Sequence, residues 1–192
     1  MPTSTGARSS ERGFTLLELA LVLLVLAIAA SMLVPRLRDI DRVRLEAGAD
    51  RLATTTRFLY EEAAFRQRPM RLHLDLDHHE YWVTVLDLEG DTPEFVVDET
   101  PLARPAALPD GVAFRDVVLP ALGLVEAGEV FGEFHPEGWA DPLVIHLRGR
   151  RGGEATIAIE PLTGRTRIAD GYVEVLPPPD AIDPFARRGA VR

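Results

Sequence analysis

The 192-residue sequence contains no cysteine and no lysine. The absence of cysteine excludes disulfide bonds and thiolate metal sites, and thiols therefore do not indicate the compartment. All 21 basic residues are arginine, and the formal net charge is −9. Surfaces that bind nucleic acid need clustered positive charge to neutralise phosphates. The composition therefore disfavours a nucleic-acid partner.

Serine is also scarce, and no serine lies beyond Ser31. This distribution excludes a serine nucleophile from the remaining five-sixths of the chain. The sequence also lacks a phosphate-binding glycine loop and a helical His-Glu-x-x-His motif. We therefore predict that the protein is not an enzyme and that it uses no cofactor.

The five histidines do not have the spacing of a metal site. His78 and His79 are adjacent and would not both face one ion, while His73 and His146 occupy polar positions in alternating segments. We expect all five histidines, including His135, at the surface. The sequence predicts no metal ion.

Long apolar runs are absent with one exception, the segment FTLLELALVLLVLAIAASMLV at residues 14–34. At a rise of 1.5 Å per residue, a helix of about 21 residues spans the roughly 30 Å hydrocarbon core of a bilayer. A short polar leader containing Arg8 and Arg12 precedes it, which suits a cytoplasmic location. The sequence predicts one transmembrane helix over residues 14–34.

An ordinary secretory signal peptide is the competing interpretation, because Ala27, Ala29 and Ala30 provide small residues for cleavage. However, the apolar run exceeds the usual length of such a signal, about 7–15 residues. It also contains Glu18, whose carboxylate costs a few kcal/mol in lipid unless it is paired. Glu18 is therefore a candidate functional residue.

The residues around Glu18, RGFTLLE at positions 12–18, resemble the class III signal of type IV pilins and type II secretion pseudopilins. The resemblance implies that prepilin peptidase cuts between Gly13 and Phe14, and that Phe14 becomes the N-methylated first residue. It also implies that Glu18 pairs with the N-terminal amine of a neighbouring subunit. An ammonium and a carboxylate that are poorly solvated in lipid attract each other strongly.

The signals for membrane orientation in the sequence disagree. Four arginines follow the apolar run, at positions 36, 38, 42 and 44, and the positive-inside rule would place them in the cytoplasm. The class III signal implies the opposite orientation, with the bulk of the chain in the periplasm, and we follow the signal. Pro35, where these families often carry a proline, is expected to kink or interrupt the helix.

Residues 35–68 read as an amphipathic stalk helix that continues the apolar run. Its apolar or small residues recur at a spacing of three to four: Leu45, Gly48, Leu52, Thr55, Leu59 and Ala63. We expect this stripe to lie on a sheet. The charged residues on the other faces suit either a solvated surface or a subunit contact.

From residue 69 the periodicity changes to alternation typical of strands. A hairpin is expected from residues 70–76 and 80–86, with its turn at 77–79. Further strands are expected at residues 95–97, 112–119, 130–135, 143–148, 155–160 and 165–168. A helix followed by antiparallel strands gives an α+β fold, with a β-rich domain over residues 69–176. Residues 177–192 lack periodicity and are expected to be disordered.

The later segments resemble the GspH/FimT group of pilin-like proteins. The segments that carry this resemblance are residues 57–85, FHPEG at 134–138, LVIHL at 143–147 and AIEPLTGR at 158–165. The resemblance implies a pilin-like fold and a minor pseudopilin near the tip of a type II secretion filament. The implied partners are the major and minor pseudopilins, prepilin peptidase, the inner-membrane assembly platform and membrane lipid. The implied location is the inner membrane, crossed once.

Two other functions remain open. The first is a FimT-like minor pilin for DNA uptake or motility, although removal of residues 1–13 would lower the formal charge from −9 to −10. The arginines at 148, 150 and 151, or those at 187, 188 and 192, could still bind phosphate. The second is a membrane-anchored periplasmic enzyme or binding protein, whose chain would keep its leader or be cut near Ala30.

Overall fold

The computed structural model describes residues 15–90 and 92–174, with only the backbone of residues 32–39. The chain divides into two compact units, residues 1–39 and residues 40–192, and each is described by itself. The predicted leader at residues 1–13, Phe14 and the predicted disordered tail at residues 177–192 lie outside the described residues.

One long helix, α1 (Leu16–Arg66), dominates the N-terminal third of the chain. It passes through residue 35 without a break, so the predicted interruption at Pro35 is wrong, whereas a kink stays a prediction. A proline inside a helix removes one backbone hydrogen bond, and the turns on either side can keep theirs. Gln67 ends the helix with a positive φ of 55°, and the Arg68 N–H donates to the carbonyl of Ala63.

The predicted apolar stripe of α1 is confirmed, since all six of its residues are buried. Leu45, Leu52, Leu59 and Ala63 belong to the same core as side chains from both sheets. Gly48 allows close approach, because a Cβ at this position would lie 3.2 Å from a ring carbon of Pro109.

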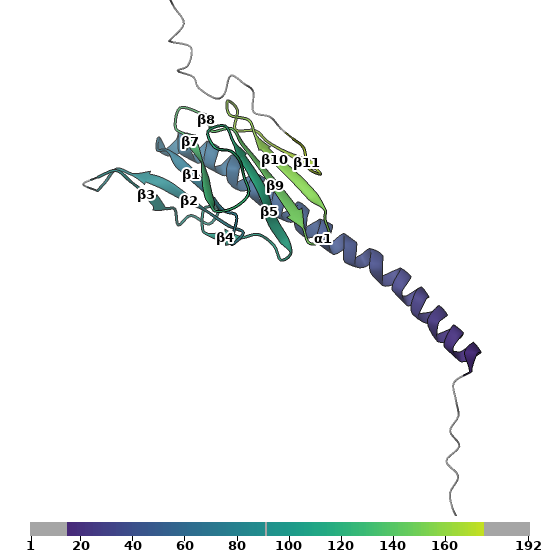
Figure 1. The fold of residues 1–192 in the computed structure, drawn as a ribbon. Coiled ribbons are helices and arrows are strands. Elements are labelled where there is room, and N and C mark those ends of the chain that lie inside the picture. The colour runs from purple at the N-terminus through teal and green to yellow at the C-terminus, as the bar shows by residue number, and fades with distance from the viewer. Residues whose placement is uncertain (1–14, 91, 175–192) are drawn as a thin grey trace, which may run out of the picture. The chain divides into compact units, whose positions relative to one another are not determined.

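The first sheet contains six antiparallel strands (Figure 1). Its main order is β3-β2-β1-β7-β8, and β4 pairs with the start of β2. The strands are β1 (Met70–Asp75), β2 (Glu80–Asp87), β3 (Glu94–Val97), β4 (Ala106–Ala107), β7 (Glu129–His135) and β8 (Trp139–Ala140). Residues alternate between buried and accessible along β1 and β7, so one face of this sheet packs on the core and the other faces solvent.

The turn between β1 and β2 is organised by Asp75. Its carboxylate accepts the backbone N–H groups of Asp77 and His78, each at 2.9 Å, and contacts the His78 ring nitrogen Nδ1 at 2.8 Å. The backbone N–H of His78 lowers the pKa of Asp75, and the hydrogen bond to Asp75 raises the pKa of His78. The ionised carboxylate therefore holds the hairpin turn closed.

The second sheet has the order β11-β10-β9-β5-β6, and all its pairings are antiparallel. The strands are β5 (Val112–Leu119), β6 (Gly123–Val125), β9 (Leu143–Gly149), β10 (Glu154–Ile159) and β11 (Thr166–Asp170). A bulge between Phe114 and Asp116 shifts the register of β5 against β9. Every residue of β9 except Arg148 is buried, so other parts of the protein cover both faces of this central strand.

The α+β fold is confirmed, and all eight predicted strands are present with ends within two residues of the prediction. The two sheets and the second part of α1 share one hydrophobic core, which includes Leu52, Leu72, Phe134, Ile145 and Ile157. Three strands were not predicted: β4, β6 and β8. Each has only two or three residues, too few to show an alternating pattern.

Candidate functional site

The predicted processing residues lie at the edge of the described chain. Gly13 and Phe14 precede its first residue, Thr15. Glu18 is described, and it lies exposed in the first turn of α1. The structure therefore locates the predicted docking residue, while the predicted cleavage and methylation at Gly13 and Phe14 stay predictions.

Thr15 caps the start of α1. Its hydroxyl oxygen accepts the backbone N–H of Glu18 at 3.2 Å, which satisfies one of the free N–H groups at the helix end. Thr15 and Glu18 have the Ser/Thr-x-x-Glu spacing of a capping box, a signal for a helix start that is present in the sequence itself. The positive end of the helix dipole favours a carboxylate at this position. The geometry thus places an exposed anion four residues from the predicted new N-terminus.

The first part of α1 exposes its apolar side chains. Every residue from 15 to 31 is exposed, and Leu16 and Leu17 have exposed fractions of 87% and 81%. Within the described part of the chain, no helix contains a stretch long and apolar enough to cross a membrane. The predicted span at residues 14–34 includes Phe14 and the side chains of residues 32–34, which are outside the description, and it stays a prediction.

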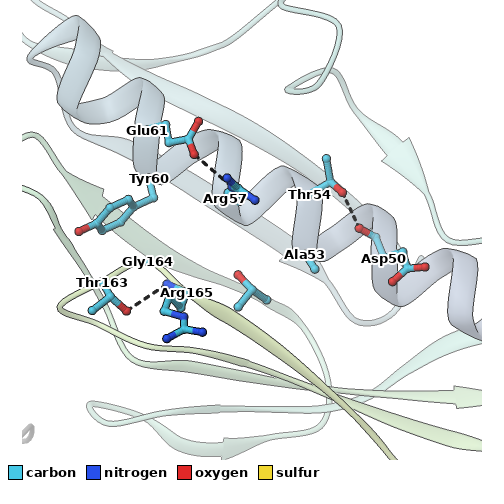
Figure 2. Close-up of a pocket in the computed structure, with 10 residues that line it drawn as sticks. Asp50, Ala53, Thr54, Arg57, Tyr60, Glu61, Thr163, Gly164 and Arg165 are labelled. Carbon is cyan, nitrogen blue, oxygen red and sulfur yellow. Dashed lines mark hydrogen bonds and ion pairs between the residues drawn. The ribbon is translucent and has the colours of Figure 1, made fainter.

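A cleft of about 620 Å³ lies between α1 and the turn that joins β10 to β11 (Figure 2). Polar and charged side chains from α1 line one wall, and residues 163–166 line the other. Arg57 and Glu61 form an ion pair at 3.1 Å on the α1 wall, and Arg165 lies on the opposite wall. Such a mixed lining suits contact with a polar polypeptide surface more than with an apolar ligand.

Tyr60 fastens this turn to the helix. Its hydroxyl donates to the carbonyl oxygen of Gly138 at 2.7 Å and lies 3.2 Å from that of Leu162. Its ring lies against Gly164, where a Cβ would come within 2.1 Å of the Tyr60 ring. Gly164 also has a φ of +61°. The wall of the cleft therefore requires glycine at position 164.

We expect Gly164→Ala to lower the free energy of unfolding by about 3 kcal/mol, because the methyl group overlaps the Tyr60 ring and the backbone is strained. Gly152→Ala is the control, since its φ is +84° but nothing lies within 4 Å of an added Cβ. This control substitution should lower the free energy of unfolding by about 1 kcal/mol. Urea unfolding of the full-length chain in detergent, followed by circular dichroism, measures both. Equal losses would contradict the close Tyr60–Gly164 contact.

The prediction that all histidines lie at the surface is wrong for His146, which is 1% exposed. His73, His79 and His135 are partly buried, and only His78 is exposed. Local alternation could not reveal the burial of His146, because the segment of residues 171–174, far along the chain, packs on its side chain.

His146 joins this covering segment to the sheet. Its Nδ1 lies 2.5 Å from Oδ1 of Asp116, its Nε2 lies 3.0 Å from the carbonyl oxygen of Val173, and its ring stacks on Tyr172 at 4.1 Å. The Thr156 hydroxyl donates to the Gly171 carbonyl at 2.7 Å and accepts the Val173 N–H at 2.9 Å. These bonds satisfy polar groups that would otherwise be costly to bury. The cluster is therefore structural.

We expect His146→Leu to lower the free energy of unfolding by about 3 kcal/mol, because the buried Asp116 carboxylate loses its short contact to His146 and keeps only the longer one to Arg115, at 3.4 Å. The double variant Asp116→Leu/His146→Leu should be more stable than this single variant, since an apolar pair carries no stranded charge. Chemical denaturation of four full-length proteins, the wild type, His146→Leu, Asp116→Leu and the double variant, tests the order. A double variant whose loss equals the sum of both single losses would contradict the proposed pairing.

A metal role finds no geometric support in the described residues. Across positions 15–90 and 92–174, no three histidine or acidic side chains lie together in a way that could hold a metal ion.

Known proteins match the N-terminal segment of the chain and its fold in separate comparisons. Residues 8–34 match a protein family described as the prokaryotic N-terminal methylation motif. This segment includes Gly13, Phe14 and Glu18. No curated protein matches the sequence.

Solved structures match the fold. A structure of the minor pseudopilin EpsH from the type 2 secretion system of Vibrio cholerae has a TM-score of 0.51 and 13% identity, covering 66% of this chain and 97% of EpsH. A crystal structure of EpsH from the same organism has a TM-score of 0.53 and 12% identity, covering 66% and 95%. The solution structure of E. coli GspH has a TM-score of 0.48 and 11% identity, and the match covers 67% of this chain and 88% of GspH.

The chain therefore carries the N-methylation motif of type IV pilin-like proteins and has the pilin-like fold of the EpsH minor pseudopilins. In that fold an N-terminal helix packs against antiparallel sheets, as the second part of α1 does here.

Proposed function

We propose that this protein is a minor pseudopilin of a type II secretion system, a filament subunit near the tip that aids export of folded proteins across the outer membrane. One observation carries the proposal: the methylation motif leads directly into a helix whose second part packs in a minor-pseudopilin fold. The first part of α1 anchors the precursor in the inner membrane, and the β-rich domain lies in the periplasm.

Processing precedes assembly in this proposal. Prepilin peptidase removes residues 1–13 and methylates Phe14. Gly13 suits the cleavage site because a residue without a Cβ lets a protease approach the backbone closely. The inner-membrane assembly platform then passes the mature subunit to the major and minor pseudopilins.

Glu18 directs docking. Its carboxylate lies exposed in the first turn of α1, close to where the mature N-terminus begins. An incoming subunit pairs this carboxylate with an N-terminal amine. In lipid both charges are poorly solvated, so their pairing relieves two unfavourable exposures. The exposed leucines of α1 then pack against neighbouring helices.

The role is association, and no catalysis is proposed. The two EpsH structures that support it belong to structural subunits of a secretion system. The alternative, a FimT-like minor pilin, shares the processing and docking steps. It differs in the phenotype that loss of the protein produces.

A deletion strain of the source organism, complemented with variants, tests the proposal. Wild-type protein should restore exoproteins in the culture supernatant, whereas Glu18→Gln should be processed normally but restore secretion less than a tenth as well, because it lacks the docking charge. Glu46→Gln is the matched control. Glu46 is exposed on the same helix and pairs with Arg42 at 2.7 Å. It should complement like the wild type.

Supernatant protein, twitching motility and DNA uptake are measured in every strain. Intact secretion in the deletion strain, with motility or DNA uptake lost, would transfer the protein to a type IV pilus. Full complementation by Glu18→Gln would remove Glu18 from docking.

A further inference from the structure

The solvent-facing side of the first sheet is built from cross-strand rows. The strand register aligns Trp82 of β2, His73 of β1 and Phe131 of β7, which we name the aromatic row. Two residues further along each strand, on the same face, the register aligns three carboxylates. We name these the acidic row: Glu80, Asp75 and Glu129.

The aromatic row is held rigidly. The His73 ring stacks on Trp82 with centroids 5.2 Å apart and lies 5.6 Å from the Phe131 ring. The two ring nitrogens of His73 contact Glu129 at 2.8 Å and Thr84 at 3.0 Å. Rings that are already ordered lose little conformational entropy when a ligand binds. Phe131 remains 43% exposed and Trp82 is partly exposed, so two rings of the row are accessible.

This face already binds one cation of its own. The Arg71 guanidinium carbon lies 3.6 Å from the centre of the Phe95 ring and 4.5 Å from that of Phe131. Its Nε donates to the Glu133 carboxylate at 2.8 Å. A guanidinium between aromatic rings and a carboxylate is the favourable setting for a cation–π contact. The contact shows that the rings on this face accommodate a guanidinium group.

The remaining charge on this face is negative. Arg71 is the only arginine in β1, β2 and β7, and Glu133 neutralises it. The acidic row lies beside the aromatic row, with Glu80 exposed and the Glu129 side chain 52% exposed. Asp75 is held in the turn by its contacts with His78, so Glu80 and Glu129 are the more exposed carboxylates of the row.

We propose that the aromatic and acidic rows together bind arginine or lysine side chains on an extended segment of a partner protein. Charge complementarity selects this occupant: each cation lies over a ring of the aromatic row while a carboxylate of the acidic row neutralises it. The inference stands apart from the filament role, because it uses only residues of the β-rich domain.

Intrinsic fluorescence tests the proposal directly, since both tryptophans of the chain, Trp82 and Trp139, lie on this sheet. Trp139 stacks on His135 at 3.5 Å, on β8 beside β7. The probe is an acetylated, amidated octapeptide of alternating glycine and arginine, titrated into the full-length protein in non-ionic detergent. A saturable change in fluorescence that weakens with added salt is expected. The same peptide with glutamate in place of arginine should give no change.

Two variants locate the site. Glu80→Gln/Glu129→Gln keeps the shapes but removes two charges, and it should weaken arginine-peptide binding about fivefold or more. Phe131→Leu removes one accessible ring and should also weaken it. Glu46→Gln, which changes an exposed carboxylate on α1 outside the cleft, should bind like the wild type. Far-ultraviolet circular dichroism confirms that each variant is folded.

Three outcomes would overturn the proposal. They are no saturable response to the arginine peptide, an equal response to the glutamate peptide, and equal binding by the double variant and Glu46→Gln. These measurements use purified protein, so their failure leaves the secretion phenotype of the deletion strain unaffected.

Discussion

Burial of one face of α1 against both sheets is the constraint on which the described domain depends. Leu52, Leu59 and Ala63 are fully buried, and each contributes to the same core as the inner residues of β1, β2, β9 and β10. The helix completes a core that two small sheets alone would leave open to water. The same helix begins within the segment that matches the methylation motif, so the element that stabilises the domain also carries Glu18, the residue proposed for assembly.

Much of this fold could be predicted from local pattern. The spacing of Leu45, Leu52 and Leu59 predicted the buried stripe, strict alternation predicted β1, and aromatic and β-branched residues predicted β2. Turn signals between apolar runs predicted the long strands of the second sheet. The failures have physical reasons. The strands β4, β6 and β8 are too short to have a period, and they form because neighbouring strands offer free hydrogen-bonding edges. His146 is buried because a distant segment returns over β9, which a local period does not encode.

Among the candidate sites, too, some could be predicted from local sequence and others could not. Glu18 could be predicted because one carboxylate in an apolar run is unusual in a single stretch of sequence. The Tyr60–Gly164 contact and the aromatic and acidic rows could not, since they depend on register and on residues about 50 to 100 positions apart. Trp82, His73 and Phe131 are unremarkable in sequence, and their meaning comes from lying in one cross-strand row.

The central claim is that the mature protein begins at a processed and methylated Phe14, shortly before α1 in the sequence. The most direct measurement is the intact mass of the protein isolated from membranes of the source organism, with fragmentation of its N-terminal peptide. The account predicts a chain of residues 14–192 that carries one additional methyl group on Phe14. A chain that still begins at Met1, or one cut near Ala30, would contradict it.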